Sequence, residues 1–64
     1  MRTVLHLVRP GATPEAVAER DWVVYLQDSE LVLAPATSAP LPPGPVTHDQ
    51  LVLLSFAADL VVTW

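Results

Sequence analysis

The stretch that decides the fold is VTHDQLVLLSFAADLVVTW, residues 46–64. It is apolar almost throughout, so it reads as a membrane segment, as a pair of buried strands, or as a helix followed by a strand. From Leu51 onward the apolar run is interrupted by Ser55, Asp59 and Thr63. A helix that crosses a bilayer needs about 20 predominantly apolar residues. The interruptions therefore speak against a membrane span.

The sequence THDQ, residues 47–50, has the pattern of a helix capping box. The hydroxyl of Thr47 can accept a hydrogen bond from the amide of Gln50, and the Gln50 side chain can reach back to the amide of Thr47. Val46 and Leu51 then occupy the two positions of a hydrophobic staple. Together these signals favour a helix over a strand at this point.

The predicted helix begins at 48 and is apolar around most of its circumference. At 100° per residue, His48, Ser55 and Asp59 fall on one narrow stripe, and apolar residues fill the rest. A surface helix usually has an apolar arc of little more than 100°, so we expect this helix to be covered on more than one side. Residues 60–64 are rich in β-branched side chains, which predicts a final strand.

Upstream, short apolar runs alternate with turn residues. TVLHLVR (3–9) and WVVYLQ (22–27) predict strands. The second run is almost continuously apolar, which is typical of a strand covered on both faces. Thr13 and Pro14 suit the N-cap and the first helical position, so a short helix is predicted at 14–20.

A two-residue link at 28–29 separates strand 22–27 from the next apolar run at 30–34. The link is too short for a parallel crossover, so 30–34 either pairs antiparallel with 22–27 or bends away. Residues 35–45 hold five of the seven prolines and predict a Pro-rich surface loop. The expected fold is one α/β domain over 1–64, a small mixed β-sheet with two short helices in the order β-α-β-β-loop-α-β.

The composition limits the classes of function. The net charge is −4 and the three arginines do not cluster, so we expect no direct nucleic-acid binding. There is no cysteine, and two histidines are too few for a closed zinc site. We therefore expect no catalytic residues, no metal and no cofactor. The first apolar run, 4–8, is too short for a signal peptide, so a cytoplasmic location is predicted.

The apolar content is high for so short a chain. Hydrophobic residues make up 52% of the sequence, and charged residues only 16%, against about a quarter in ordinary globular domains. Small domains usually depend on disulfides, metals or oligomerisation. Since the first two are not expected, we predict a homo- or hetero-oligomer, with Leu54, Phe56 and Trp64 at the interface. For Trp64 the alternative is a hydrophobic side chain that fills the core of its own chain.

Two polar residues are candidates for a ligand site. Asp28 stands at the end of a predicted strand, where α/β sheets place their ligands, although an aspartate in a turn needs no function to explain it. His6 lies within the strand at 3–9, where a packed, hydrogen-bonded histidine is the simpler interpretation. A small enzyme or ligand-binding protein that uses Asp28 and His6 near one sheet edge is therefore one class of function.

Three stretches of the chain resemble the DsrH/TusB family of sulfur-relay proteins. VLHLVR (4–9) is similar to that family's opening strand, and DWVVYLQD (21–28) is similar to its second strand. Residues 46–64 resemble the closing segment, in which an Asp-headed amphipathic helix leads into a short strand that ends in Trp.

The resemblance implies a non-catalytic subunit that assembles with DsrE/DsrF-like partners in a complex passing sulfur towards 2-thiouridine in tRNA. Family members are commonly longer, with extra helices where this chain has only residues 29–45. Some DsrH-type proteins carry a cysteine that can hold a persulfide, but this chain has none and cannot relay sulfur covalently. The alternative is a stand-alone homo-oligomeric α/β module that has lost the relay.

Overall fold

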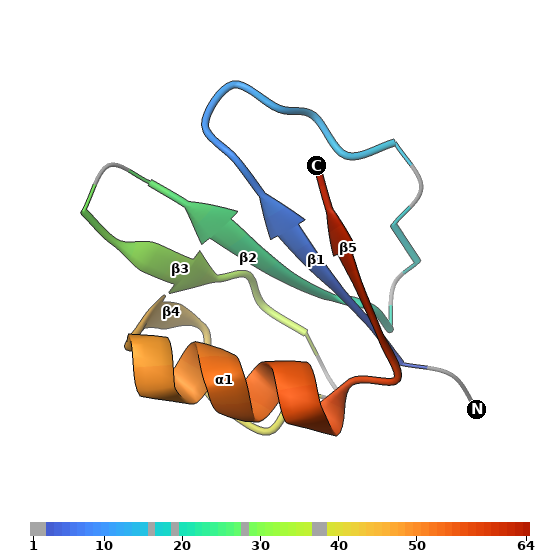
Figure 1. Cartoon of the computed structure of the whole chain (residues 1–64), viewed down its shortest axis with the longest axis vertical. Helices are drawn as coiled ribbons and strands as arrows, with labels where there is room; N and C mark the ends of the chain where they lie inside the picture. Colours follow the sequence, from blue (N-terminus) through green and yellow to red (C-terminus); the bar gives the residue numbers. More distant parts are fainter. Residues whose placement is uncertain (1–2, 16, 19, 28, 37–38) are drawn as a thin grey trace.

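The centre of the structure is a group of three parallel strands (Figure 1). In the computed structural model, which describes residues 3–15, 17–18, 20–27, 29–36 and 39–64, β1 (Val4–Val8) lies in the middle of this group. It pairs in parallel with β2 (Trp22–Leu26) on one side and with β5 (Leu60–Thr63) on the other. The parallel β1–β2 pair requires a long crossover, which residues 9–21 supply.

Two antiparallel strands extend the sheet beyond β2. β3 (Leu31–Leu33) forms a hairpin with β2, and β4 (Gly44–Val46) pairs with β3. The described residues thus form a five-stranded mixed sheet in the order β4-β3-β2-β1-β5. The expected mixed sheet is confirmed, and of the two alternatives for residues 30–34 the hairpin is correct. The Pro-rich segment ends in a strand that the sequence did not predict. Its place at the edge of the sheet fits the proline rule, because Pro45 has no amide to donate.

The helix α1 (His48–Ala57) begins where the capping box predicts. The amide of Gln50 donates to the Thr47 hydroxyl at 3.1 Å, and the Thr47 amide donates to the Gln50 side chain at 2.8 Å. At the other end, the Ala58 amide donates to the carbonyl of Leu54 at 3.0 Å, and the chain turns into β5.

The helix predicted at 14–20 is wrong for every described residue of that segment. Asp21 explains the failure. Its carboxylate accepts a hydrogen bond from the Ala18 amide at 3.0 Å, and its own amide donates to the Ala18 carbonyl at 3.0 Å. Such local side-chain bonds offer the backbone an alternative to a helix. A helix this short also gains little by itself.

The core lies between one face of the sheet and α1, as Figure 1 shows. The buried members come from three strands and the helix: Leu5, Trp22, Val24, Leu33 and Leu54. On the opposite face, His6, Val8 and Val23 are also buried. Side chains alternate between the two faces along β1, so one strand contributes to both layers.

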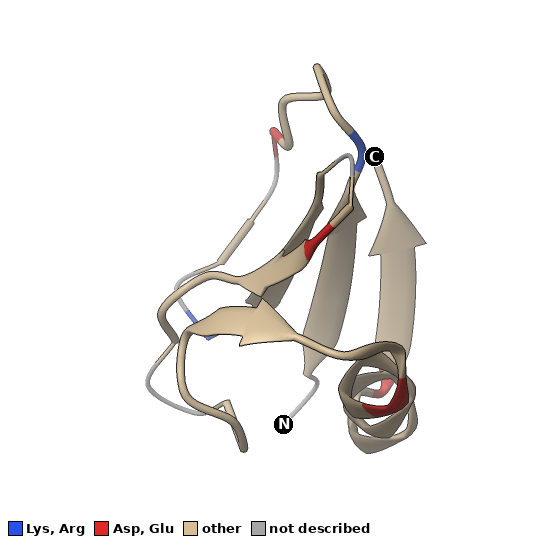
Figure 2. Cartoon of the chain, turned by 90° about the vertical axis from the view of Figure 1, so that its left-hand side faces the viewer, with Lys and Arg blue, Asp and Glu red and all other residues tan. Residues whose placement is uncertain are grey.

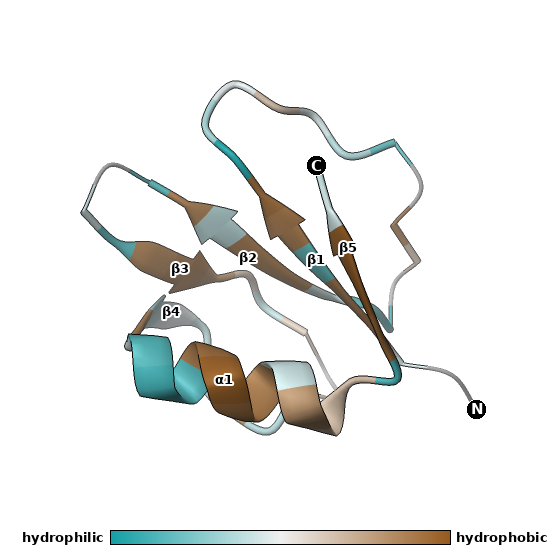
Figure 3. Cartoon of the chain, in the orientation of Figure 1, coloured by the Kyte–Doolittle hydropathy of each residue, from teal (hydrophilic) through white to brown (hydrophobic). Residues whose placement is uncertain are grey.

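The other described residues cover only one side of α1. Leu54 is fully buried, whereas Val52, Leu53 and Phe56 are 50%, 62% and 84% exposed. The expectation that the helix is covered on more than one side is not met by the described residues. Figure 3 shows that the ribbon of α1 is coloured as hydrophobic over much of its length after the first turn.

Candidate functional site

His6, Asp21 and Trp64 form one hydrogen-bonded cluster, the His6 cluster. β1 carries His6, Asp21 ends the crossover just before β2, and Trp64 follows β5. His6 Nε2 lies 2.8 Å from Asp21 Oδ2, and Trp64 Nε1 donates to His6 Nδ1 at 2.8 Å. The rings of His6 and Trp64 also stack, with centroids 6.0 Å apart and planes at 28°. The cluster therefore ties together three segments that are distant in the sequence.

These contacts fix the proton on the imidazole of His6. The indole nitrogen of Trp64 can only donate, so His6 Nδ1 must accept. The carboxylate of Asp21 can only accept, so His6 Nε2 must carry the proton and donate it. The ring is thus neutral, and both of its nitrogens are used inside the protein. His6 is only 3% exposed, and with both ring nitrogens hydrogen-bonded neither is free to serve as a metal ligand in this arrangement.

The environment of Asp21 stabilises its ionised form. The hydrogen bond from His6 lowers the pKa of the Asp21 carboxyl; burial opposes this effect, and the hydrogen bond from the Ala18 amide adds to it. The net result is a pKa below the ordinary value, because hydrogen bonds to a carboxylate favour the charged form. Asp21 thus behaves as the charged anchor of a structural cluster.

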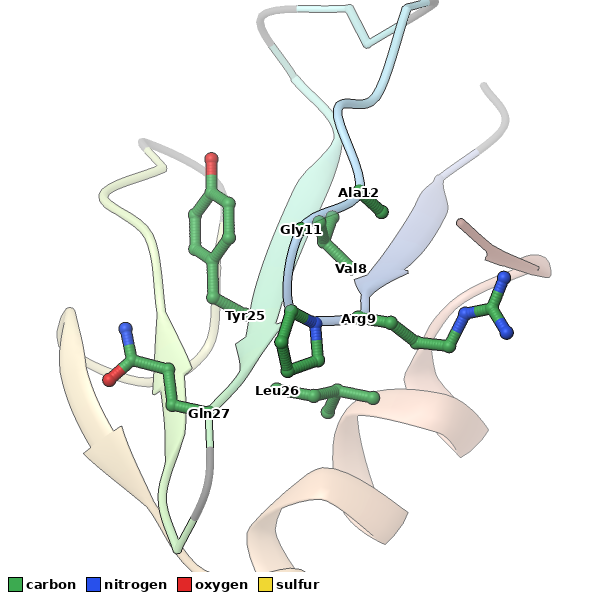
Figure 4. Close-up of a pocket in the computed structure, with 8 residues that line it drawn as sticks. Val8, Arg9, Gly11, Ala12, Tyr25, Leu26 and Gln27 are labelled. Carbon is green, nitrogen blue, oxygen red and sulfur yellow. The ribbon is translucent and has the colours of Figure 1, made fainter.

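A hollow of about 400 Å³ lies at the carboxyl ends of β1 and β2 (Figure 4). It is lined by residues 8–12 and 25–27. Parallel strands of α/β sheets place their ligands at such an edge. Its lining offers the Tyr25 hydroxyl and the Gln27 amide, whereas the guanidinium of Arg9 extends away from both. Arg9 instead donates through Nε to the Trp64 carbonyl at 2.8 Å.

The described lining residues of this hollow carry no carboxylate and no imidazole. Among them, the hydroxyl of Tyr25 is the kind of group that can act as a general acid or base. Of the two predicted site residues, Asp28 lies outside the described residues. His6 is in the buried cluster with both ring nitrogens engaged. His6 does not line the hollow, and its pairing with Asp28 stays a prediction.

Among the described residues, the three most exposed large apolar side chains lie on α1 and form its outer stripe: Val52, Leu53 and Phe56. At 100° per residue, Val52 and Phe56 lie about 160° from Leu54 around the helix, and Leu53 lies about 100° from it. Among the residues predicted for an interface, Phe56 is on this stripe, Leu54 is used in the core of the chain, and Trp64 is partly buried against His6. The sequence interpretation did not single out Val52 and Leu53. The exposure of Val52 follows from the phase of the helix once Leu54 is known to face inward.

The sequence interpretation also did not single out Asp21. Asp21 stands directly before β2, where a polar side chain can contact the neighbouring strand of the sheet. Its partner His6 is fifteen positions away in sequence. Only the parallel register of β1 and β2, which places His6 beside Val23, brings the two side chains together.

Comparisons with known proteins leave the chain without an assigned relative. No family model, curated protein or solved structure matches it. Within the described residues, no helix has the length and apolar character needed to span a bilayer. The same residues hold no group of three histidine, aspartate or glutamate side chains placed to bind a metal ion.

Proposed function

We propose that this chain is a non-catalytic assembly subunit of a sulfur-relay complex of the tRNA 2-thiouridine type. The observation that carries the proposal is the outer stripe of α1. The stripe presents Val52, Leu53 and Phe56 to solvent. The ring of His6, by contrast, is hydrogen-bonded on both nitrogens to residues of the same chain. The stripe is an attachment surface, and the partner class comes from the resemblance to DsrH/TusB proteins.

The size of the stripe supports a docking role. Phe56 alone is 84% exposed, and the three side chains together expose on the order of 300–400 Å² of apolar surface. A patch of this size equals the largest patch on a typical monomer, and such patches are often functional. Aromatic residues such as Phe56 are enriched at the centre of protein interfaces.

The charges around the stripe also favour a protein partner. Asp49 is exposed in the first turn of α1, and the chain carries a net charge of −4. These negative charges repel phosphate backbones, which agrees with a role in which the chain does not itself contact the tRNA. Because the chain has no cysteine, it holds no persulfide, and the sulfur would pass through cysteines of DsrE/DsrF-like partners.

The test is co-purification from the native host with a matched pair of variants. We expect the tagged chain to retain a DsrE-like subunit, and Leu53→Ser/Phe56→Ser to lose it. Val17→Ser is the control, because Val17 is an exposed apolar residue outside α1. A deletion strain should lose 2-thiouridine from its tRNA, and the control variant should restore it. Normal thiolation in the deletion strain, together with no DsrE-like protein in the purified sample, rejects the proposal.

A second candidate is the stand-alone homo-oligomeric α/β module. The specific observation in its favour is the open outer edge of β5, which differs from the proline-containing edge of β4. This candidate predicts that the isolated chain is soluble and self-associates without a foreign partner.

A further inference from the structure

The two edges of the sheet are unlike in their capacity to accept another strand. β4 carries Pro45, which has no amide hydrogen, and Pro42 and Pro43 precede it. Proline, charge and a very short length are among the usual protections of an edge strand. β5 (Leu60–Thr63) is short but carries no proline and no charged residue, and Figure 2 shows no charge along it. Within the described part of the chain, nothing pairs with its outer edge.

The hydrogen bonds to β1 identify which backbone groups of β5 face outward. The Leu60 amide donates to the Thr3 carbonyl at 3.3 Å, and the Trp64 amide donates to the Leu7 carbonyl at 2.8 Å. Backbone groups alternate in direction along a strand. The N–H and C=O groups of Val61 and Thr63 therefore point to the open edge.

We infer that a second copy of this chain pairs with that edge, antiparallel, about a two-fold axis through Val62. Val61 then lies opposite Thr63 of the second copy, and Thr63 lies opposite Val61 of the second copy. These are the residues whose backbone groups face outward, so each pair exchanges both of its N–H···O bonds. The result is one continuous sheet through the two copies.

A second copy fits this edge better than a different chain for two reasons. A two-fold axis makes one short strand complementary to itself, and such isologous pairs are the commonest oligomers. Two copies also each carry a charge of −4, so they must meet where they bring few charges together. β5 is uncharged, and its Leu60 and Val61 side chains are each 40% exposed and available for cross-strand packing.

The area available makes the dimer reversible. A four-residue strand is only about 13 Å long, so edge pairing falls in the class of small interfaces, below about 1,200 Å² in total. We expect a dissociation constant of roughly 10–100 µM. This self-association is independent of the proposed sulfur-relay role, because it uses β5 and leaves the outer stripe of α1 free.

Two measurements on the 64-residue chain test the inference. Sedimentation velocity from about 1 µM to about 1 mM should show a monomer–dimer equilibrium. Amide hydrogen exchange should show protection of Val61 and Thr63 that rises with concentration. The Val62 amide points to β1, so its protection should not depend on concentration.

The matched variants are Thr63→Pro and Thr63→Val. Proline removes an outward amide that makes no bond to β1, and edge positions tolerate it. Valine keeps the amide and the β-branched shape. We expect Thr63→Pro to weaken dimerisation at least tenfold and Thr63→Val to leave it unchanged. If Thr63→Pro does not fold, Val61→Lys takes its place. It puts a charge on the edge, and we expect it to weaken dimerisation by the same factor.

Three results overturn the inference. A monomer throughout the concentration range removes it. A dimer that survives Thr63→Pro and Val61→Lys but is lost in Leu53→Ser/Phe56→Ser assigns self-association to α1 instead. Concentration-independent exchange at Val61 and Thr63 excludes the stated register. Loss of the DsrE-like partner in the host with an intact dimer rejects only the proposed function, so the two failures are distinguishable.

Discussion

Replacing Trp64 with phenylalanine tests the role of the His6 cluster. The change keeps an aromatic ring to stack on the imidazole, whose centroid lies 6.0 Å away, but it removes the indole N–H. His6 Nδ1, in a side chain only 3% exposed, then loses its donor. A buried acceptor left unsatisfied costs about 1–3 kcal/mol. In a domain of this size about 2 kcal/mol lowers the Tm by about 10 °C.

Thermal unfolding followed by circular dichroism measures this effect, with Tyr25→Phe as the control. The Tyr25 hydroxyl makes no hydrogen bond to a described residue, so removing it should leave the Tm unchanged. Because phenylalanine is also smaller than tryptophan, a double-mutant cycle with His6→Leu separates the hydrogen bond from lost packing. We expect a coupling free energy of about 1 kcal/mol or more between the two positions. Strictly additive effects of the two substitutions would show that the hydrogen bond between Trp64 and His6 does not stabilise the fold.

Three further predictions concern the core, the helix cap and acid stability. Leu54→Ala should lower the free energy of unfolding by about 2–5 kcal/mol, whereas Phe56→Ser should change it by no more than about 0.5 kcal/mol. Urea unfolding of the two variants measures both changes. Equal losses of stability would contradict the burial pattern. Thr47→Ala removes the side-chain acceptor of the Gln50 amide and should cost about 1 kcal/mol in the same assay. The lowered pKa of Asp21 stabilises the fold above the unfolded pKa of about 3.9, and this stability is lost as pH falls through the lower folded pKa. Asp21→Asn should therefore reduce stability at neutral pH and flatten the decline below about pH 4; a parallel, undiminished decline would contradict the assignment.

The elements predicted best are those with local signals. The capping box at Thr47 and Gln50 fixed the start of α1, because both of its hydrogen bonds lie within four residues. The short link between 22–27 and the following run excluded a parallel connection, which left the hairpin of β2 and β3 as one of two options.

Two elements were predicted wrongly, for different reasons. Thr13 and Pro14 gave a proper helix start, but Asp21 binds the Ala18 amide and holds the segment in a turn, so one local signal competes with another. β4 forms within a proline-rich stretch because β3, which lies outside that stretch, offers it an antiparallel edge.

The candidate interface was predicted only in part, for a physical reason. The apolar arc of the helix is so wide that the narrow polar stripe does not indicate which of the apolar residues faces the core. Leu54 and Phe56 looked equivalent, yet one is fully buried and the other is 84% exposed. The pairing of His6 with Asp21 likewise needed the register of two parallel strands.

Hydroxyl-radical footprinting of Phe56 tests most directly whether the outer stripe of α1 is a contact surface in the cell. The tagged chain is oxidised once as the purified polypeptide and once within the native complex, and Tyr25 serves as the internal reference. We predict that oxidation of Phe56 falls several-fold in the complex while that of Tyr25 is unchanged. Equal reactivity of Phe56 in both samples would mean that no partner covers the helix, and the assembly role would be excluded.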